Sequence, residues 1–438
     1  MKNMKNSTFL LADTWWFGGT ARISLSDFEK ALNLRKRQGF NAIQIVAGVP
    51  PETPFFSNEA KNAGGHPFTK DFELNLAYFE ELDMRIQLIL KKGMKPVIYG
   101  GWGHHIDIVG IDGAKRLWKE LVARYGNLPV VFCLTGEADV FLNGYPVKNA
   151  QIKKGGLRLL ENVSPVLFQK IRVLKHTVKN YGLAGSSKLL EERVKRWNEV
   201  GKFVENIKPG AIPLTVHVSG NYDASTLFGN PSWLTLNSFQ SGHSHGRLYF
   251  MRDRILRGKK PIINLEPWYE GIFNDFKEHL QRQAFWICAL SGASGHGYGA
   301  HGVWQIEKND GFMSHWGNSN YEKALGFKGA SALGKGKELI GAFDSTGLRV
   351  DKTAILPQFN KSNQNYPVAA RLEGKTLIYF PDISGREFTL KLAGKVKLTW
   401  ILTQECNVIA TEYESGSEVT VRPDNYGNED KLLIVEPN

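Results

Sequence analysis

Two glutamates in this 438-residue chain lie at or just beyond the ends of short apolar runs, a position from which a carboxyl group can do acid–base chemistry. Glu137 stands in Thr-Gly-Glu-Ala-Asp after the run 130–134, and Glu266 stands in Leu-Glu-Pro-Trp-Tyr after the run 262–265. Cleaving a glycosidic bond needs such a pair, because one acid protonates the leaving oxygen while a second carboxylate attacks the anomeric carbon or activates water. We expect Glu137 to be the general acid/base and Glu266 to be the nucleophile.

This assignment has alternatives in the same residues. Asp139 lies two positions after Glu137 and could hold the acid role; otherwise we expect it to bind substrate. Either glutamate could instead form a structural ion pair beneath a loop. A retaining mechanism requires carboxyl groups about 5–5.5 Å apart and an inverting one about 6.5–9.5 Å. We favour retention.

Aromatic and polar side chains gather at the same positions, directly after apolar runs. Indole and phenol rings can stack on sugar rings, although each could also pack over the mouth of the fold. The expected stacking residues are Trp15, Trp102, Trp268, Tyr269, Tyr298 and Trp304. The side chains expected to bind sugar hydroxyls are Asp13, His104, His217, Gln240 and His243.

The histidines also raise the alternative of a metal-dependent barrel hydrolase. His104, His217 and His243 could form a ligand cluster with Asp13. Against this, no His-x-His follows the first apolar run, and no lysine lies where it would bridge two metals. We therefore expect neither a metal nor an organic cofactor. A further alternative is a carbohydrate-binding protein on a barrel that has lost catalysis.

The elements that must position these residues are eight short apolar runs, which alternate with helical patterns and so predict parallel strands joined by crossovers. The runs are 8–12, 42–46, 95–99, 130–134, 214–218, 234–239, 262–265 and 297–303. The predicted helices are 27–37, 74–92, 115–125, 157–181, 188–207, 248–257, 276–291 and 321–339. Eight such units predict a (β/α)₈ barrel, whose active site lies at the carboxyl ends of the strands. A doubly wound sheet would carry a glycine-rich turn after its first strand, where this chain has Ala-Asp-Thr-Trp-Trp.

The pattern changes near residue 343. Apolar and polar residues then alternate, as at 388–392 and 396–400, which is typical of antiparallel strands. We expect a catalytic domain over residues 1–343 and a small antiparallel β-sandwich over 344–438.

Charge and hydropathy limit the partners. Residues 1–343 hold 44 basic and 30 acidic residues, which favours a polyanion such as an acidic polysaccharide. The basic residues are scattered and no nucleic-acid module is evident, so nucleic acid is not an expected partner. No apolar run approaches the ~18–20 residues of a membrane span. Location stays open: secreted or periplasmic if a signal peptide was removed, otherwise cytoplasmic. Oligomeric state is equally open.

Several motifs together resemble the apiosidase-like glycoside hydrolases of family 140. They are Ala-Asp-Thr-Trp-Trp (12–16), His217 with Ser-Gly (219–220), Gln-Ser-Gly-His-Ser (240–244), Glu-Pro-Trp-Tyr-Glu (266–270), Gly-His-Gly-Tyr-Gly (295–299) and Gly-Val-Trp-Gln (302–305). The C-terminal strands resemble that family's appended β-sandwich, a domain of the collagen-binding type. The resemblance implies a (β/α)₈ hydrolase of polysaccharide side chains, with Glu266 matching the catalytic glutamate after strand seven. Glu137 falls where the family has aspartate after a Gly-Gly pair.

Overall fold

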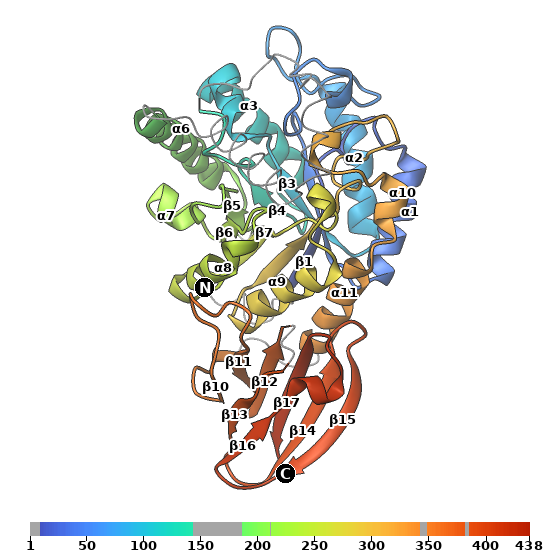
Figure 1. Cartoon of the computed structure of the whole chain (residues 1–438). Helices are drawn as coiled ribbons and strands as arrows, with labels where there is room; N and C mark the ends of the chain where they lie inside the picture. The colour runs from blue at the N-terminus through green and yellow to red at the C-terminus, as the bar shows by residue number, and fades with distance from the viewer. Residues whose placement is uncertain (1–8, 143–185, 211, 342–347, 382–384) are drawn as a thin grey trace, which may run out of the picture.

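The computed structural model describes residues 9–142, 186–210, 212–341, 348–381 and 385–438. It consists of a sheet surrounded by helices, followed by a smaller group of antiparallel strands at the bottom of the view (Figure 1). The predicted helix at 157–181 and the predicted boundary after residue 343 lie outside the described residues.

The first eight strands form one parallel sheet in the order β5-β4-β3-β2-β1-β8-β7-β6, which is a nearly closed barrel. The strands are β1 (Leu10–Trp15), β2 (Ala42–Val46), β3 (Lys95–Tyr99), β4 (Val131–Cys133), β5 (Leu214–Thr215), β6 (Asn237–Gln240), β7 (Ile262–Glu266) and β8 (Gly295–Tyr298). Between β5 and β6, the backbone N–H of Thr235 donates to the carbonyl of Leu214 at 3.0 Å. The predicted (β/α)₈ fold is confirmed.

Strand β8 begins and ends earlier than the predicted run 297–303. Its position depends on glycine, because a Cβ on Gly295 would lie 2.6 Å from the Leu10 carbonyl oxygen and one on Gly297 would lie 2.5 Å from the Leu265 carbonyl oxygen. Because glycine has no side chain, this strand can approach both neighbouring strands closely. The apolar pattern of the sequence does not indicate where close strand contact requires glycine.

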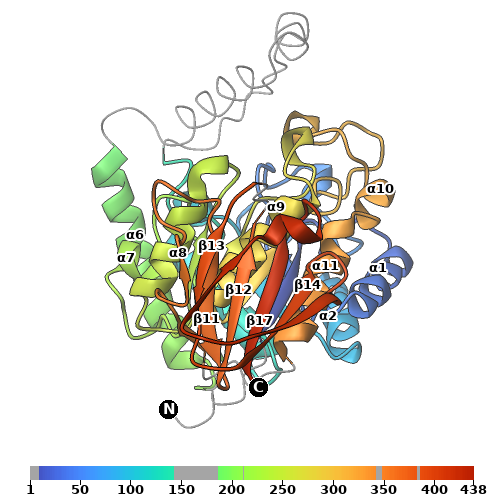
Figure 2. The same cartoon turned by 60° about the horizontal axis from the view of Figure 1, so that its bottom comes forward.

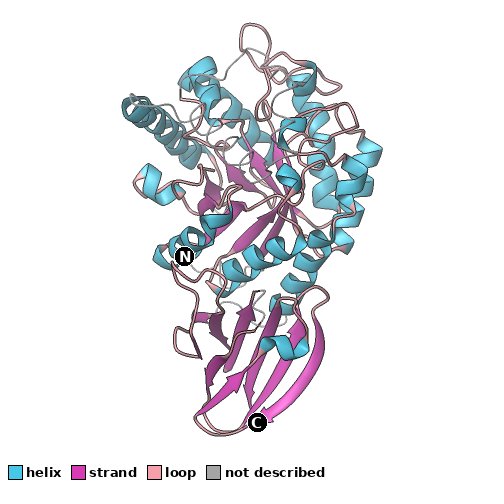
Figure 3. Cartoon of the chain, viewed as in Figure 1, coloured by secondary structure: helices cyan, strands magenta, loops and turns pink. Residues whose placement is uncertain are grey.

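The helices surround the sheet (Figures 1 and 3). They are α1 (Leu25–Arg37), α2 (Leu76–Lys91), α3 (Ile106–Tyr125), α6 (Ser186–Ile207), α7 (Ala224–Phe228), α8 (Leu248–Arg257), α9 (Glu278–Leu290), α10 (Tyr321–Leu325) and α11 (Lys328–Gly341). The single helix predicted over 321–339 is two helices, because α10 ends at a C-cap glycine, Gly326. None of the helices in the described ranges is long and apolar enough to cross a membrane.

The C-terminal strands form two antiparallel sheets, as predicted. A three-stranded sheet has the order β10-β13-β16 and a six-stranded sheet has the order β15-β14-β17-β12-β11-β9. The strands are β9 (Arg349–Val350), β10 (Ile355–Leu356), β11 (Val368–Leu372), β12 (Lys375–Phe380), β13 (Phe388–Lys391), β14 (Val396–Leu402), β15 (Asn407–Glu414), β16 (Glu418–Val421) and β17 (Lys431–Pro437). Buried Phe380, Phe388 and Trp400 pack in the core of this β-sandwich.

The six-stranded sheet has a second buried face, which packs on the barrel near α9 (Figure 2). Tyr379 stacks on Trp286 of α9 with ring centroids 6.1 Å apart. Arg282 of α9 donates from Nη2 to Asp430 at 2.6 Å, and each side chain is 3% exposed. The apolar residues of this sheet face, including Ile401, belong to the same core cluster as the barrel.

Candidate active site

The end of β1 decides which of its residues reach the barrel interior, because successive side chains point to opposite faces of a strand. Asp13 forms a fully buried ion pair with Arg35 of α1 at 2.6 Å, and Trp15 packs edge-on against Phe28 of the same helix. Both therefore point outward to the helix layer and do not line the cavity. The neighbouring Trp16, absent from the prediction, lines it instead.

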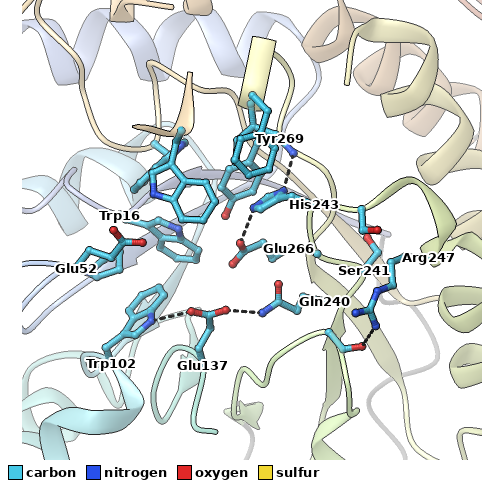
Figure 4. Close-up of a pocket in the computed structure, with 18 of the residues that line it drawn as sticks. Trp16, Glu52, Trp102, Glu137, Gln240, Ser241, His243, Arg247, Glu266 and Tyr269 are labelled. Atoms are coloured by element: carbon cyan, nitrogen blue, oxygen red, sulfur yellow. Dashed lines mark hydrogen bonds and ion pairs between the residues drawn. The ribbon is translucent and has the colours of Figure 1, made fainter. Parts of the chain in front are cut away.

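An open cavity collects seven of the predicted site residues from strand ends spread around the barrel (Figure 4). These are Trp102, Glu137, Gln240, His243, Glu266, Tyr269 and Trp304. It also contains residues to which the sequence analysis assigned no role, among them Trp16, Glu52, Phe141, Asn221, Arg247 and Trp316. Most of these lie in loops, where no strand end or periodic pattern marks them.

Glu137 is positioned by an extension of the β3–β4 pairing beyond both strands. The backbone N–H of Gly136 donates to the Gly101 carbonyl at 2.8 Å, and that of Gly103 donates to the Gly136 carbonyl at 2.7 Å. A Cβ on Gly136 would lie 2.5 Å from the Trp102 ring, so only glycine permits this contact. Glu137 itself has φ +37°, a left-handed backbone conformation that the surrounding structure must hold in place.

Two side-chain donors orient the Glu137 carboxyl group (Figure 4). Trp102 donates from Nε1 to Oε2 at 3.2 Å, and Gln240 donates from Nε2 to Oε1 at 2.8 Å. Burial raises the pKa of Glu137 to about 8, with a further increase from the charge of Glu266, while the two donors act in the opposite direction. The group therefore tends to hold a proton at neutral pH, as a general acid must.

Glu266 is the last residue of β7, and its carboxyl group lies beside two histidines. His243 Nε2 is 3.1 Å from Oε1, and His217 Nε2 is 3.6 Å from Oε2. The backbone N–H of Tyr269 donates to His243 Nδ1 at 3.4 Å, so Nε2 carries the hydrogen that points at Glu266. Burial lowers the pKa of both histidines to about 3, which keeps them neutral.

Burial also raises the pKa of Glu266 to about 8, partly offset by an interaction with Tyr269. The partly buried Glu137 and the buried Glu266 thus share one cavity, and each carboxyl group has a pKa well above its ordinary value. Such displaced values are typical of acid–base sites. The arrangement can donate one proton while keeping a second carboxylate available for attack.

Asp139, the alternative acid, does not line the cavity. Its Oδ1 accepts the backbone N–H of Ser219 at 2.7 Å and its Oδ2 accepts the Ser219 hydroxyl at 2.5 Å. The side chain is 2% exposed, and it joins the loop after β4 to the loop after β5. This geometry gives Asp139 a structural role.

Two more predicted binding residues pack away from the cavity. His104 contacts the ring of Phe141 with centroids 5.1 Å apart and does not line the cavity. Trp268 donates from Nε1 to the Ser244 carbonyl at 2.9 Å and is 1% exposed. Each contacts a residue of the cavity wall and so supports the wall rather than forming it.

Tyr298 belongs to a buried polar cluster behind β1 and β8. Its hydroxyl donates to Glu270 Oε2 at 2.7 Å, and its ring lies 5.6 Å from the guanidinium carbon of Arg35, the partner of Asp13. Burial raises the pKa of Glu270 to about 7. The predicted Asp13 and Tyr298 are therefore neighbours, but in the layer between sheet and helices.

In the part of the chain that the structure describes, no group of three or more His, Cys, Asp or Glu side chains is arranged to hold a metal ion. His104 packs apart from His217 and His243, which both face Glu266.

The fold is that of solved glycoside hydrolases. One described as a glycoside hydrolase matches with a TM-score of 0.76 and 20% identity, over 98% of this chain and 93% of the other. A family 5 glycoside hydrolase from Bacteroides vulgatus ATCC 8482 matches with a TM-score of 0.75 and 18% identity, over 98% and 89% of the two chains. Among curated proteins, none matches the sequence.

A family model described as the apiosidase-like catalytic domain matches residues 1–346. The chain belongs to this apiosidase-like family and is a glycoside hydrolase, as its sequence motifs predicted. A carbohydrate substrate follows from that class. The family number 140 stays a prediction.

Proposed function

We propose that this protein cleaves glycosidic bonds in an acidic polysaccharide or its side chains by a retaining, two-carboxylate mechanism. Glu137 is the general acid/base and Glu266 is the nucleophile. The observation that carries the proposal is the pair itself: two carboxyl groups in one cavity, close enough for the charge of Glu266 to raise the pKa of Glu137.

The contacts of the pair support this division of roles. Glu266 faces the N–H of neutral His243 and interacts with Tyr269, and both contacts favour its ionised form. Once Glu266 is ionised, its charge keeps the proton on Glu137. Glu266 then attacks the anomeric carbon while Glu137 protonates the leaving oxygen. In the second step Glu137 removes a proton from the water that releases the sugar.

The cavity walls support a sugar substrate. Trp16, Trp102 and Tyr269 present aromatic rings around the two carboxyl groups (Figure 4), and Trp304 also lines the cavity. Within the described residues, the buried Nε1–H of Trp304 has no hydrogen-bond partner. A buried donor without a partner is costly, and a sugar hydroxyl would satisfy it. The excess of basic residues over positions 1–343 favours a polyanionic polymer.

The test is hydrolysis of a panel of acidic and branched polysaccharides by the wild type, Glu137→Gln and Glu266→Gln. We expect each change to lower the rate ~10³-fold or more, since each removes a group that acts on the reacting atoms. Asp139→Asn is the control for the alternative acid and should keep the alkaline limb of the pH profile. Equal cleavage by wild type and both glutamine variants would refute the assignment.

The stereochemical part is tested separately by following the first product with proton NMR. A retaining enzyme first releases a sugar with the same anomeric configuration as the substrate, which is observed before mutarotation. A first product of the opposite anomeric configuration would show inversion. Polymer binding without cleavage by the wild type would instead favour a carbohydrate-binding protein.

A further inference from the structure

Arg247 places a positive charge on one side of the cavity. It lies in the loop between β6 and α8 and lines the cavity together with Gly220. Figure 4 shows Arg247 beyond Gln240, on the side opposite Glu52. Its Nη1 donates to the Gly220 carbonyl oxygen at 2.9 Å, and the residue is half-buried.

A second guanidinium group meets the same carbonyl oxygen. Arg254 of α8 donates from Nη2 to the Gly220 carbonyl oxygen at 2.9 Å, while its buried Nη1 has no hydrogen-bond partner among the described residues. The charges of Asp223 and Asp253 act on Arg254 from farther away, and no ion pair joins either arginine to a carboxylate of the described residues. Two cations therefore lie side by side, and no carboxylate in the described part of the chain forms an ion pair with either.

Like charges held together cost free energy that an anion would recover. The planar fork of an arginine matches the oxygens of a carboxylate or a sulfate ester, and it can bind them through two parallel hydrogen bonds. Arg247 is the member of this pair that reaches the cavity. The unpaired cation therefore faces the space where the proposed substrate lies.

We propose that Arg247, with Arg254 behind it, forms an anion subsite that binds a carboxylate or sulfate ester on a sugar adjacent to the bond that is cleaved. The proposal rests on the proposed function, because it takes the cavity to be the polysaccharide site. Glu137 and Glu266 act on the bond, whereas Arg247 selects the substrate by its charge.

The test measures binding rather than turnover, in a Glu266→Gln background that prevents cleavage. Three trisaccharides are titrated: one of galacturonate, one of galactose, and one of galactose bearing sulfate esters. Tryptophan fluorescence reports binding, since Trp16, Trp102, Trp304 and Trp316 all line the cavity. We expect at least one anionic trisaccharide to bind about 10-fold or more tightly than galactose, and the preference to shrink in high salt.

Arg247→Gln should remove that preference, and Arg247→Lys should keep part of it because the charge remains without the fork. The matched control is Arg257→Gln on the same helix, since Arg257 is 76% exposed and pairs with Asp253. It should keep the full preference. Whether galacturonate or the sulfated sugar is favoured identifies the anion.

The proposal is overturned if the anionic and neutral trisaccharides bind equally or not at all. It is also overturned if Arg247→Gln, with an unchanged melting temperature, retains the preference. Failure of the glycosidase assignment would appear elsewhere, in the rates of Glu137→Gln and Glu266→Gln. The two results are therefore distinguishable.

Discussion

At the residue scale, the proton of the carboxyl pair should set the pH dependence of activity. In the proposed mechanism, attack requires Glu266 to be ionised, and leaving-group departure requires Glu137 to be protonated. Because burial raises both pKa values to about 8, kcat/KM should rise toward pH 8 and fall above it. Rates measured from pH 5 to 10 test this; an optimum near pH 5 would contradict it.

The same groups should cost stability when they ionise. A carboxyl whose pKa is higher in the folded than in the unfolded state binds more protons when folded, so folding is destabilised as pH rises from about 4.5 to 8. Glu137→Gln removes this effect and should stabilise the protein by up to about 4 kcal/mol at pH 8, because each unit of pKa difference corresponds to about 1.4 kcal/mol. Thermal melting at pH 5 and pH 8 measures it. A gain that does not grow with pH would contradict the explanation.

Trp304 allows a separate test of hydrogen bonding against stacking. Trp304→Phe keeps an aromatic ring but removes the Nε1–H that has no partner in the described residues. If that group binds a sugar hydroxyl, KM should rise about 3- to 10-fold with little change in kcat, which corresponds to one ordinary hydrogen bond. An unchanged KM would leave Trp304 with a stacking role only.

At the element scale, the junction of β3 and β4 should be intolerant of a single methyl group. Gly136→Ala would place Cβ 2.5 Å from the Trp102 ring and so displace the indole that orients Glu137. Misplacing a catalytic group by about 1 Å can cost 100-fold, and we expect a loss of up to about that size in kcat/KM. Gly210→Ala is the matched control, because no atom of the described residues lies within 4 Å of the added Cβ.

The secondary-structure elements also show which part of this site could be predicted from the sequence alone. Apolar runs located the eight strands and hence the residues that follow them, among which Glu137, Gln240, His243 and Glu266 do meet in one cavity. An apolar run does not show whether a given side chain points into the barrel or toward the helices. Asp13 therefore seemed a binding residue, although strand alternation turns it toward the helices.

Loop residues were unpredictable for a different reason. Arg247 reaches the cavity because the β6–α8 loop folds back until its guanidinium contacts the Gly220 carbonyl. Glu52 reaches it with a left-handed backbone, φ +51°. Such positions depend on contacts between distant segments, which no local periodicity encodes.

At the scale of the whole molecule, the Arg282–Asp430 ion pair joins the barrel to the six-stranded sheet. Asp430 also accepts hydrogen bonds from Tyr379 and Thr403, and both charged side chains are 3% exposed. Arg282→Ala leaves a buried carboxylate without its cation and should cost about 3–5 kcal/mol of unfolding free energy. Arg282→Met combined with Asp430→Asn should recover part of it. Denaturant unfolding of the three proteins measures the effect.

Because the barrel and the six-stranded sheet share one core, neither can be replaced without affecting the other. Ile401 and Tyr379 of the six-stranded sheet bury their side chains in the same cluster as the barrel. A binding module joined only by a flexible linker can be exchanged between enzymes by recombination. This sheet differs, because removing it would also remove half of its buried interface with the barrel. A barrel transferred to another protein would therefore have to keep its C-terminal sheet.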